Sequence, residues 1–211
     1  MKKFEEKTTQ TTSIYDGKIV KLQVDDVTLP NGKSAKREII KHPGAVAVIA
    51  ITNDGKLVVV EQYRKALERS IIEIPAGKLE PGEEPIVTAR RELEEETGYG
   101  AEEFTFLQTF ATSPGFADEV IHLYVAKKLY TIENKAELDE DEFVELMEIS
   151  LEEAKAMVAD ERIYDAKTAL AILWFEMSHY SGSKYIIPIS TFSNIFPPGF
   201  PSILFISSPF E

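Results

Sequence analysis

The sequence predicts an α/β fold: an α/β/α sandwich built on a mixed sheet, preceded by a small N-terminal antiparallel β-sheet. Three observations support this prediction. Residues 45–51 (AVAVIAI) and 57–63 (LVVVEQY) are apolar, strand-like runs joined by an Asn-Asp-Gly turn. Helical segments at 83–97 and after residue 150 alternate with further strands. Before them, the stretch from about 13 to 41 contains two strand-like segments around Pro-Asn-Gly, a strong hairpin signal.

The remaining elements follow in chain order. The segment IIEIPAG at 71–77 leads from the second apolar strand into the first helix. Further strands are expected at 104–110, 120–128 and 143–149. Ser150 caps a short helix, and Glu153 at its third position completes a capping box. Asp165 caps a longer helix that ends near His179.

The first helix is expected to run to about Thr97. A loop at 77–82 precedes it, and Gly98 is the C-terminal stop. Its first turn holds two acids and a proline, which helix starts favour. Helical spacing places four residues on the face toward the core: Ile86, Ala89, Leu93 and Thr97.

Glutamates crowd this helix beside its apolar face. Glu92 and Glu96 are four residues apart, and Glu95 lies three after Glu92. Arg91 is expected to pair with Glu95, while Glu92 and Glu96 have no basic residue four positions earlier. Like charges at this spacing cost roughly 0.2–0.5 kcal/mol on an exposed helix. Carboxylates gathered in this way suit a hard divalent cation, Mg²⁺ or Mn²⁺. For a glutamate-rich string alone, a solvated helix face is the alternative.

The full pattern favours the cation. It consists of a glycine, five residues, Glu, seven residues, Arg-Glu-Leu, one residue, Glu-Glu, one residue, Gly and a bulky residue, from Gly77 to Tyr99. This pattern resembles the Nudix box, which usually ends in an aliphatic residue, so Tyr99 is a mild departure. The resemblance covers about residues 43–180. It implies the same α/β/α sandwich, and pyrophosphate chemistry on a nucleoside diphosphate linked to another group.

On this resemblance, the motif residues take specific roles. Glu92 and Glu96, with the backbone carbonyl of Ala76, are expected to hold one Mg²⁺, and Glu95 a second ion. Arg91 is expected to orient the glutamates. Three further positions shape the loop and the helix ends: Gly77, Glu83 and Gly98.

The general base is expected outside the motif. Relatives in the ADP-ribose pyrophosphatase group, which this chain resembles, use a glutamate from a loop between late strands. Here the acidic run at 137–142 supplies Glu140 as the first candidate and Glu142 as the second. A solvated loop is the alternative for most of this run. A metal-bound hydroxide would need no base beyond the motif.

The substrate group is suggested by Pro114, fifteen residues after the box, within Ser-Pro-Gly-Phe. A proline there, followed by Gly115, resembles the ADP-ribose pyrophosphatases of bacteria and archaea. An ordinary turn is the alternative. The implied reaction is Mg²⁺-dependent hydrolysis of ADP-ribose to AMP and ribose 5-phosphate. Other candidates are a pyrophosphatase for a nucleotide sugar, NADH or a dinucleoside polyphosphate, and a non-catalytic ADP-ribose sensor.

Two arginines complete the predicted site. Arg64 follows an apolar strand and is expected to bind phosphate, with Glu73 beside it in the substrate-binding set. A structural ion pair of Arg64 with Glu73 or Glu61 is the alternative. The family resemblance also implies a homodimer with exchanged N-terminal sheets. Arg37 is then a candidate for a contact with the partner's substrate, and an exposed strand arginine is its alternative.

Composition excludes several classes of function. The chain has 211 residues, a net charge of −13 and no cysteine. An acidic protein is not expected to bind nucleic acid, and disulfides and thiolate metal sites are excluded. No apolar run reaches the length of a membrane span, and the N-terminus does not predict a signal peptide, so we expect a cytoplasmic protein. We divide the chain into an N-terminal sheet (1–42), a catalytic domain (43–180) and an apolar extension (181–211).

Overall fold

The computed structural model describes residues 3–133 and 143–180. Residues Met1–Glu176 form one compact unit, and Met177–Glu211 form a second, of which only the end of the last helix is described. The predicted bases Glu140 and Glu142 and the extension at 181–211 lie outside the described residues.

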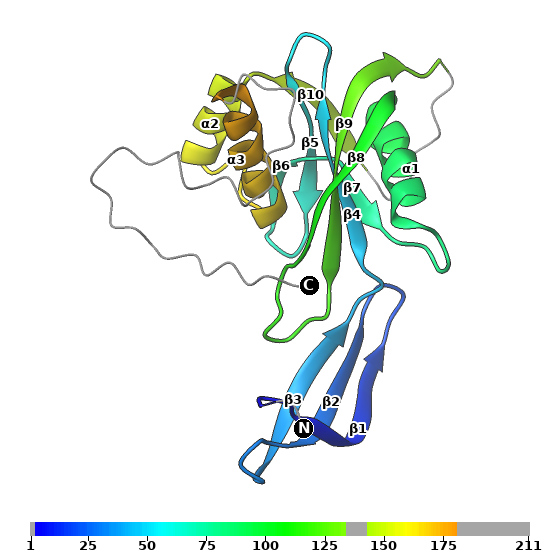
Figure 1. Cartoon of the computed structure of the whole chain (residues 1–211), viewed down its shortest axis with the longest axis vertical. Coiled ribbons are helices and arrows are strands. Elements are labelled where there is room, and N and C mark those ends of the chain that lie inside the picture. Colours follow the sequence, from blue (N-terminus) through cyan, green and yellow to red (C-terminus); the bar gives the residue numbers. More distant parts are fainter. Residues whose placement is uncertain (1–2, 134–142, 181–211) are drawn as a thin grey trace, which may run out of the picture. The chain divides into compact units, whose positions relative to one another are not determined.

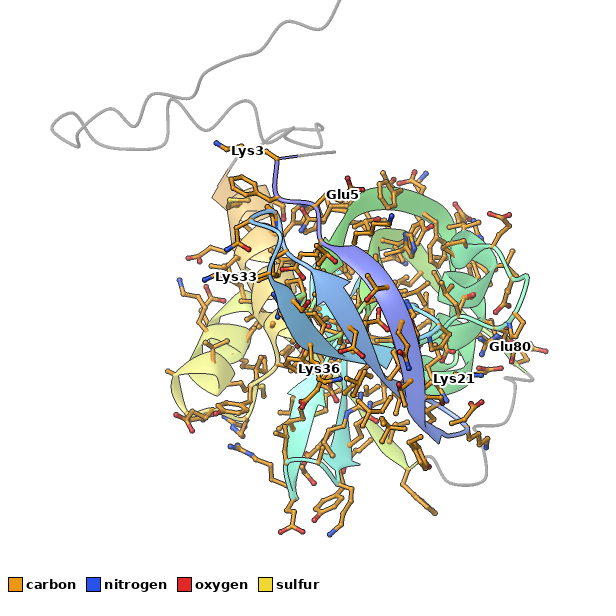
Figure 2. The ribbon with its side chains drawn as sticks, turned by 90° about the horizontal axis from the view of Figure 1, so that it is seen from below. Lys3, Glu5, Lys21, Lys33, Lys36 and Glu80 are labelled. Atoms are coloured by element: carbon orange, nitrogen blue, oxygen red, sulfur yellow. The ribbon has the colours of Figure 1, made fainter. Side chains whose placement is uncertain are left out.

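The N-terminal sheet has three antiparallel strands with β2 in the middle (Figure 1). These are β1 (Lys7–Asp16), β2 (Lys21–Thr28) and β3 (Ser34–Lys41). The predicted hairpin joins β2 to β3, and Gly32 in its turn has a φ of 80°. β1 begins earlier than the predicted start near 13, because it pairs along the whole length of β2. Figure 2 shows Lys21, Lys33 and Lys36 extending from this sheet and its turn.

The central sheet is mixed, as predicted. Its main order is β10-β5-β4-β9-β8, with β6 paired to β5 and β7 paired to β4. β4 and β9 run parallel, and the other neighbours are antiparallel. The strands are β4 (Ala45–Ile51), β5 (Leu57–Arg64), β6 (Arg69–Glu73), β7 (Ala76–Lys78), β8 (Tyr99–Ala111), β9 (Val120–Thr131) and β10 (Val144–Ile149).

Both faces of this sheet are covered, which explains why β4 is apolar throughout. Successive side chains of a strand point to opposite faces. Accordingly, Ala47 and Ile49 belong to one buried cluster, and Val46 and Val48 to the other. The helices α2 (Leu151–Ala159) and α3 (Ala166–Tyr180) contribute to the first cluster, and α1 (Pro85–Thr97) to the second. The predicted α/β/α sandwich is therefore confirmed (Figure 1).

Three helix ends follow the local signals of the sequence, but the start of α1 does not. The helix begins at Pro85 with Glu84 as its N-cap, so the acids expected in its first turn lie before that turn, because proline is favoured at the first helical position. Gly98 ends α1 in the left-handed conformation with a φ of 72°. Ser150 and Glu153 form the expected capping box of α2. Asp165 accepts a hydrogen bond from the N–H of Thr168 at 3.1 Å and so caps α3. Within the described ranges, no helix has both the length and the apolar character needed to cross a membrane.

Candidate active site

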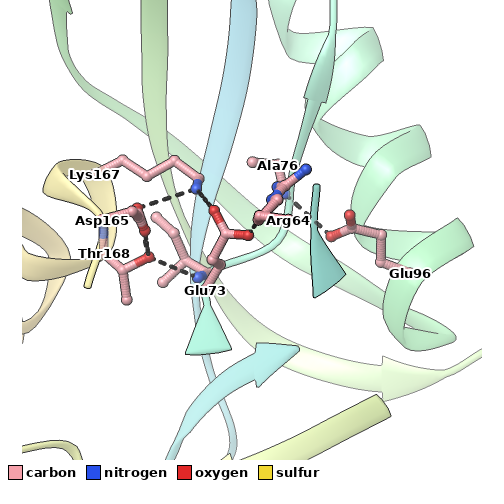
Figure 3. A network of polar contacts seen from close by, with 8 residues as sticks. Arg64, Glu73, Ala76, Glu96, Asp165, Lys167 and Thr168 are labelled. Carbon is pink, nitrogen blue, oxygen red and sulfur yellow. Dashed lines mark hydrogen bonds and ion pairs between the residues drawn. The ribbon is translucent and has the colours of Figure 1, made fainter. Parts of the chain in front are cut away.

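The acidic side of α1 lies against β7 and the loop that precedes it. Glu92 and Glu96 are buried, with 7% and 4% of their surface exposed. Glu96 Oε2 accepts a hydrogen bond from the N–H of Ala76 at 3.1 Å (Figure 3). A Cβ on Gly77 would lie 1.9 Å from Cδ of Glu92, so the Glu92 carboxylate occupies the space of the missing side chain. Both carboxylates therefore adjoin the backbone of Ala76 and Gly77.

Arg91 contacts three carboxylates of the motif. Its guanidinium lies 2.9 Å from Glu92, 2.8 Å from Glu95 and 3.2 Å from Glu83. The predicted pair of Arg91 with Glu95 is thus present. Glu92 has no basic residue four positions earlier, yet it pairs with Arg91, because a long arginine side chain can reach its neighbour as well as the residue one turn away.

These contacts stabilise the charged forms of the cluster. Burial by itself would lower the pKa of Arg91, but Glu83, Glu92 and Glu95 outweigh it and raise the pKa above its ordinary value. Hydrogen bonds from Arg91 and Thr88 lower the pKa of Glu83. Since three carboxylates share one guanidinium, the cluster keeps an excess of negative charge when all of them are ionised.

A second polar network surrounds Glu73, at the end of β6 (Figure 3). Arg64 Nε donates to Glu73 Oε2 at 2.5 Å, and Lys167 Nζ donates to Oε1. Glu73 is only 3% exposed, whereas the Arg64 side chain is 41% exposed. Burial raises the pKa of Glu73, but the charges of Lys167 and Arg64 outweigh it and the pKa is lowered. The ion-pair alternative for Arg64 is therefore present in the structure. A direct contact of Glu73 with a substrate is at odds with its burial, since both its oxygens face cations.

The loop that carries Pro114 and Gly115 joins β8 to β9 and is tied to the end of β3. The N–H of Ile40 donates to Phe116 O at 2.8 Å, and the N–H of Asp118 donates to Ile40 O at 3.1 Å. Pro114 and Gly115 themselves are exposed. The loop is thus anchored at its second half, and the two predicted residues face solvent.

Arg37 lies on β3 of the N-terminal sheet. Its guanidinium forms an ion pair with Glu6 at 2.6 Å, and its side chain is 42% exposed. The guanidinium also donates to the carbonyl oxygen of Lys36 at 3.0 Å, so its partners lie within the N-terminal segment. Within one chain, Arg37 is therefore an exposed arginine of a strand, which is the alternative given above.

Two family models match the chain. The NUDIX domain matches residues 41–169, and the nucleoside diphosphate sugar hydrolase N-terminal domain matches residues 6–40. The first match includes the whole motif from Gly77 to Tyr99 and the two networks described above.

The chain belongs to the Nudix family.

Individual relatives align over most of the chain. It is 65% identical over 176 residues to a methanol dehydrogenase activator of Bacillus methanolicus, covering 83% of this chain and 95% of that protein. It is 59% identical over 177 residues to an ADP-ribose pyrophosphatase of Bacillus subtilis (strain 168), covering 84% and 96%. The crystal structure of an ADP compounds hydrolase superposes with a TM-score of 0.73 at 22% identity, covering 84% of this chain and 95% of that one, which supports the fold.

Nudix hydrolases generally use divalent metal ions. In the part of the chain that the structure describes, no three carboxylate or imidazole side chains gather as a metal site. A metal here would therefore need backbone oxygen as well as side chains. The donor set fits: two buried carboxylates, Glu92 and Glu96, adjoin the loop backbone at Ala76, and the absence of a side chain on Gly77 makes room for one of them.

The structure thus brings the predicted residues together in separate groups. The motif residues meet around Arg91 and the start of β7 at 76–77, and Arg64 meets Glu73. Sequence reasoning missed Lys167, which lies inside a helix whose neighbours predict core. A signal was available, since a glutamate in the apolar segment IIEIPAG needs a cationic partner if it is buried.

Proposed function

We propose that this Nudix protein hydrolyses the pyrophosphate bond of ADP-ribose to AMP and ribose 5-phosphate. The observation that carries the proposal is the 59% identity to the Bacillus subtilis ADP-ribose pyrophosphatase across 96% of that protein. The arrangement of the Nudix helix α1 supports the chemistry, because its buried carboxylates adjoin the loop backbone at Ala76 and Gly77.

Glu92 and Glu96, with the carbonyl of Ala76, would hold Mg²⁺, with Mn²⁺ as the alternative, and Glu95 would support a second ion. A bound divalent cation supplies charge neutralisation at the phosphates and activates a water molecule. Arg91 orients Glu92 and Glu95 for this purpose. Its contacts with both, and with Glu83 near the helix start, support that role.

Substrate contacts are proposed for residues outside the Nudix helix. Arg64 binds a phosphate through the guanidinium nitrogens that Glu73 does not hold, since Glu73 contacts Nε. Pro114 and Gly115 border the substrate from an exposed loop. Glu73 acts through Arg64, because its oxygens already face Arg64 and Lys167.

The protein is proposed to be a homodimer in which the N-terminal sheets are exchanged and Arg37 reaches the partner's substrate. Support comes from β1, which is an edge strand with all ten residues exposed. Ile14 and Tyr15, apolar residues of this strand, are 56% and 59% exposed. Such a surface is suited to burial against a second copy.

A panel of substrates tests the activity. ADP-ribose, a nucleotide sugar, NADH and a dinucleoside polyphosphate are each incubated with the protein and Mg²⁺, and products are separated by chromatography. We expect AMP and ribose 5-phosphate, with the highest kcat/KM for ADP-ribose. A higher kcat/KM for another compound would overturn the substrate assignment. Calorimetric uptake of ADP-ribose without turnover would support a sensor in place of an enzyme.

The general base is proposed to be Glu140, with Glu142 second, to accept a proton from the attacking water. Single-turnover cleavage by Glu140→Gln and Glu142→Gln tests this role. A large loss in only one variant identifies the base. If neither variant slows cleavage, the loop does not supply it.

A second candidate function is the activation of a dehydrogenase, which the 65% identity to the methanol dehydrogenase activator favours. The test measures methanol oxidation by a methanol dehydrogenase of Bacillus methanolicus with and without this protein. Stimulation by the wild type that is lost in Glu96→Gln would make activation a consequence of Nudix hydrolysis. No stimulation would remove this candidate.

A further inference from the structure

A row of charged side chains connects the beginning of α3 to the end of β5 (Figure 3). It consists of Asp165, Lys167, Glu73 and Arg64. Lys167 Nζ contacts both Glu73 and Asp165, the latter at 3.1 Å. Glu73 in turn holds Arg64 at 2.5 Å. The row contains two cations and two anions, so it is neutral as a whole. The Lys167 side chain is only 11% exposed, which makes its charge effective on its neighbours.

Because Lys167 occupies one oxygen of Glu73, only the other oxygen is left for Arg64. One oxygen accepts from Lys167, and the other accepts from Arg64 Nε. Without Lys167, the first oxygen would be buried without its cation, which costs free energy. The exposed guanidinium of Arg64 is then drawn toward both oxygens, and its outer nitrogens turn away from solvent. Lys167 thus keeps Arg64 in a position from which it can reach a ligand.

The residue after Lys167 holds the backbone of segment 74–77, which leads from β6 into β7. Thr168 Oγ1 accepts a hydrogen bond from the N–H of Ile74 at 3.0 Å, and it donates to Asp165 Oδ1 at 2.5 Å. Thr168 and Ile74 are fully buried. The hydroxyl therefore has a defined orientation: its O–H bond points toward Asp165, and one of its lone pairs faces the N–H of Ile74.

The next two residues of this segment are tied to other elements. The N–H of Val48, on β4, donates to Pro75 O at 2.8 Å. The N–H of Ala76 donates to Glu96, on α1, at 3.1 Å. Three consecutive residues are thus attached to α3, β4 and α1 in turn. These attachments form a continuous path from Thr168 to the amide that meets Glu96.

We propose that Lys167 and Thr168 are positioning residues of the Nudix site, which act through Glu73 on Arg64 and through Ile74 on Ala76. The part that concerns Arg64 rests on the proposed function, because it requires Arg64 to bind the substrate. The part that concerns Ala76 does not.

A double-mutant cycle tests the action of Lys167 on Arg64. Kinetics with ADP-ribose are measured for wild type, Lys167→Met, Arg64→Met and the double variant. We expect Lys167→Met to raise KM about tenfold with less than about a threefold change in kcat, since binding energy is lost in ground and transition states alike. In the Arg64→Met background, the same substitution should change KM less than about twofold. Equal effects in both backgrounds would overturn the proposal.

Two further variants control for general loss of structure. Lys155→Met breaks an ion pair with Glu176 between α2 and α3, at 2.6 Å, which shares no residue with the ion pairs of Glu73. It should leave KM unchanged, whereas Lys167→Arg, which keeps the charge, should restore KM toward the wild-type value. If Lys155→Met raises KM as much as Lys167→Met, the effect is not specific to Glu73 and the proposal fails.

Hydrogen exchange tests the action of Thr168, and it also serves if Lys167→Met does not fold. Thr168→Val removes the acceptor for Ile74 with little change of shape, and Thr168→Ser keeps it. We expect faster exchange at Ile74 and also at Ala76 in Thr168→Val, and wild-type rates in Thr168→Ser. Faster exchange at Ile74 alone would overturn the transmission to Ala76.

Failure of the proposed function has a different signature. If the wild type does not hydrolyse ADP-ribose, the proposed function fails, while the exchange rates of Ile74 and Ala76 still decide the positioning role of Thr168. If the wild type is active and the cycle is additive, the function stands and the role of Lys167 is refuted.

Discussion

At the scale of single residues, Gly77 and Glu92 share a space that holds only one side chain. The contact is made by the end of a flexible glutamate, 1.9 Å from where a Cβ on Gly77 would be. The neighbouring carboxylate of Glu96 is held by a backbone amide, so its position follows from the loop. The position of these two carboxylates therefore depends on the backbone of Ala76 and Gly77 as well as on the glutamate side chains.

Gly77→Ala separates stability from activity. The added methyl displaces the Glu92 carboxylate, which can rotate away, so we expect the melting temperature to change by only a few degrees. Because Glu92 is a proposed metal ligand, kcat/KM for ADP-ribose should fall more than about tenfold. Thermal unfolding and steady-state kinetics check the two quantities. An active variant would show that the position of Glu92 does not matter.

Glu96→Gln tests the proposed metal ligand directly. The amide keeps the size of the side chain but removes its negative charge. We expect turnover of ADP-ribose at saturating Mg²⁺ to fall more than about tenfold, or about 1.4 kcal/mol of transition-state stabilisation. A smaller loss would count against Glu96 as a ligand.

At the scale of elements, helix ends and turns follow from neighbouring residues. The capping box of α2 joins Ser150 and Glu153 through hydrogen bonds of 2.8 and 3.2 Å. Gly98 closes α1 by donating to Glu94 O at 2.7 Å. Such interactions span three or four residues, and sequence spacing is sufficient to predict them.

Ser150→Ala should weaken α2 without affecting catalysis. The loss of an N-cap acceptor costs about 1 kcal/mol of the free energy of unfolding. Urea unfolding measures this cost, and Ser150→Asp, which retains an acceptor, is the matched control. Since α2 packs into one buried cluster of the sheet and α1 into the other, kcat/KM should equal that of the wild type. A large loss of activity in Ser150→Ala would contradict this assignment.

At the scale of the whole molecule, the N-terminal sheet is antiparallel and ends at Lys41, directly before the catalytic sheet begins at Ala45. Within one chain, the guanidinium of Arg37 pairs with Glu6 of the same N-terminal segment. The homodimer proposal brings it to a second site by exchange of the sheets.

Mixing two inactive chains tests that exchange. Arg37→Ala and Glu96→Gln are purified separately, and each should be impaired. In a random mixture about half of the dimers are hetero-dimers, and each has one site with both residues intact, so about a quarter of the sites should be active. Activity of the refolded mixture that equals the mean of the two variants would refute a shared site.

The sequence by itself determined the sandwich, the C-terminal end of α1 and one cap of each helix that the structure describes, because these depend on periodicity and on residues a few positions apart. It also placed Glu92, Glu95 and Glu96 on one helix beside the core. The tertiary structure alone decided that Arg91 reaches Glu92 as well as Glu95, and that the loop carrying Ala76 meets Glu96. It likewise revealed Lys167 beside Glu73, which are separated by 94 positions. Contacts between residues so far apart in the sequence arise when one layer of the fold packs on another. The spacing of residues along the chain does not show which of them will meet in this way.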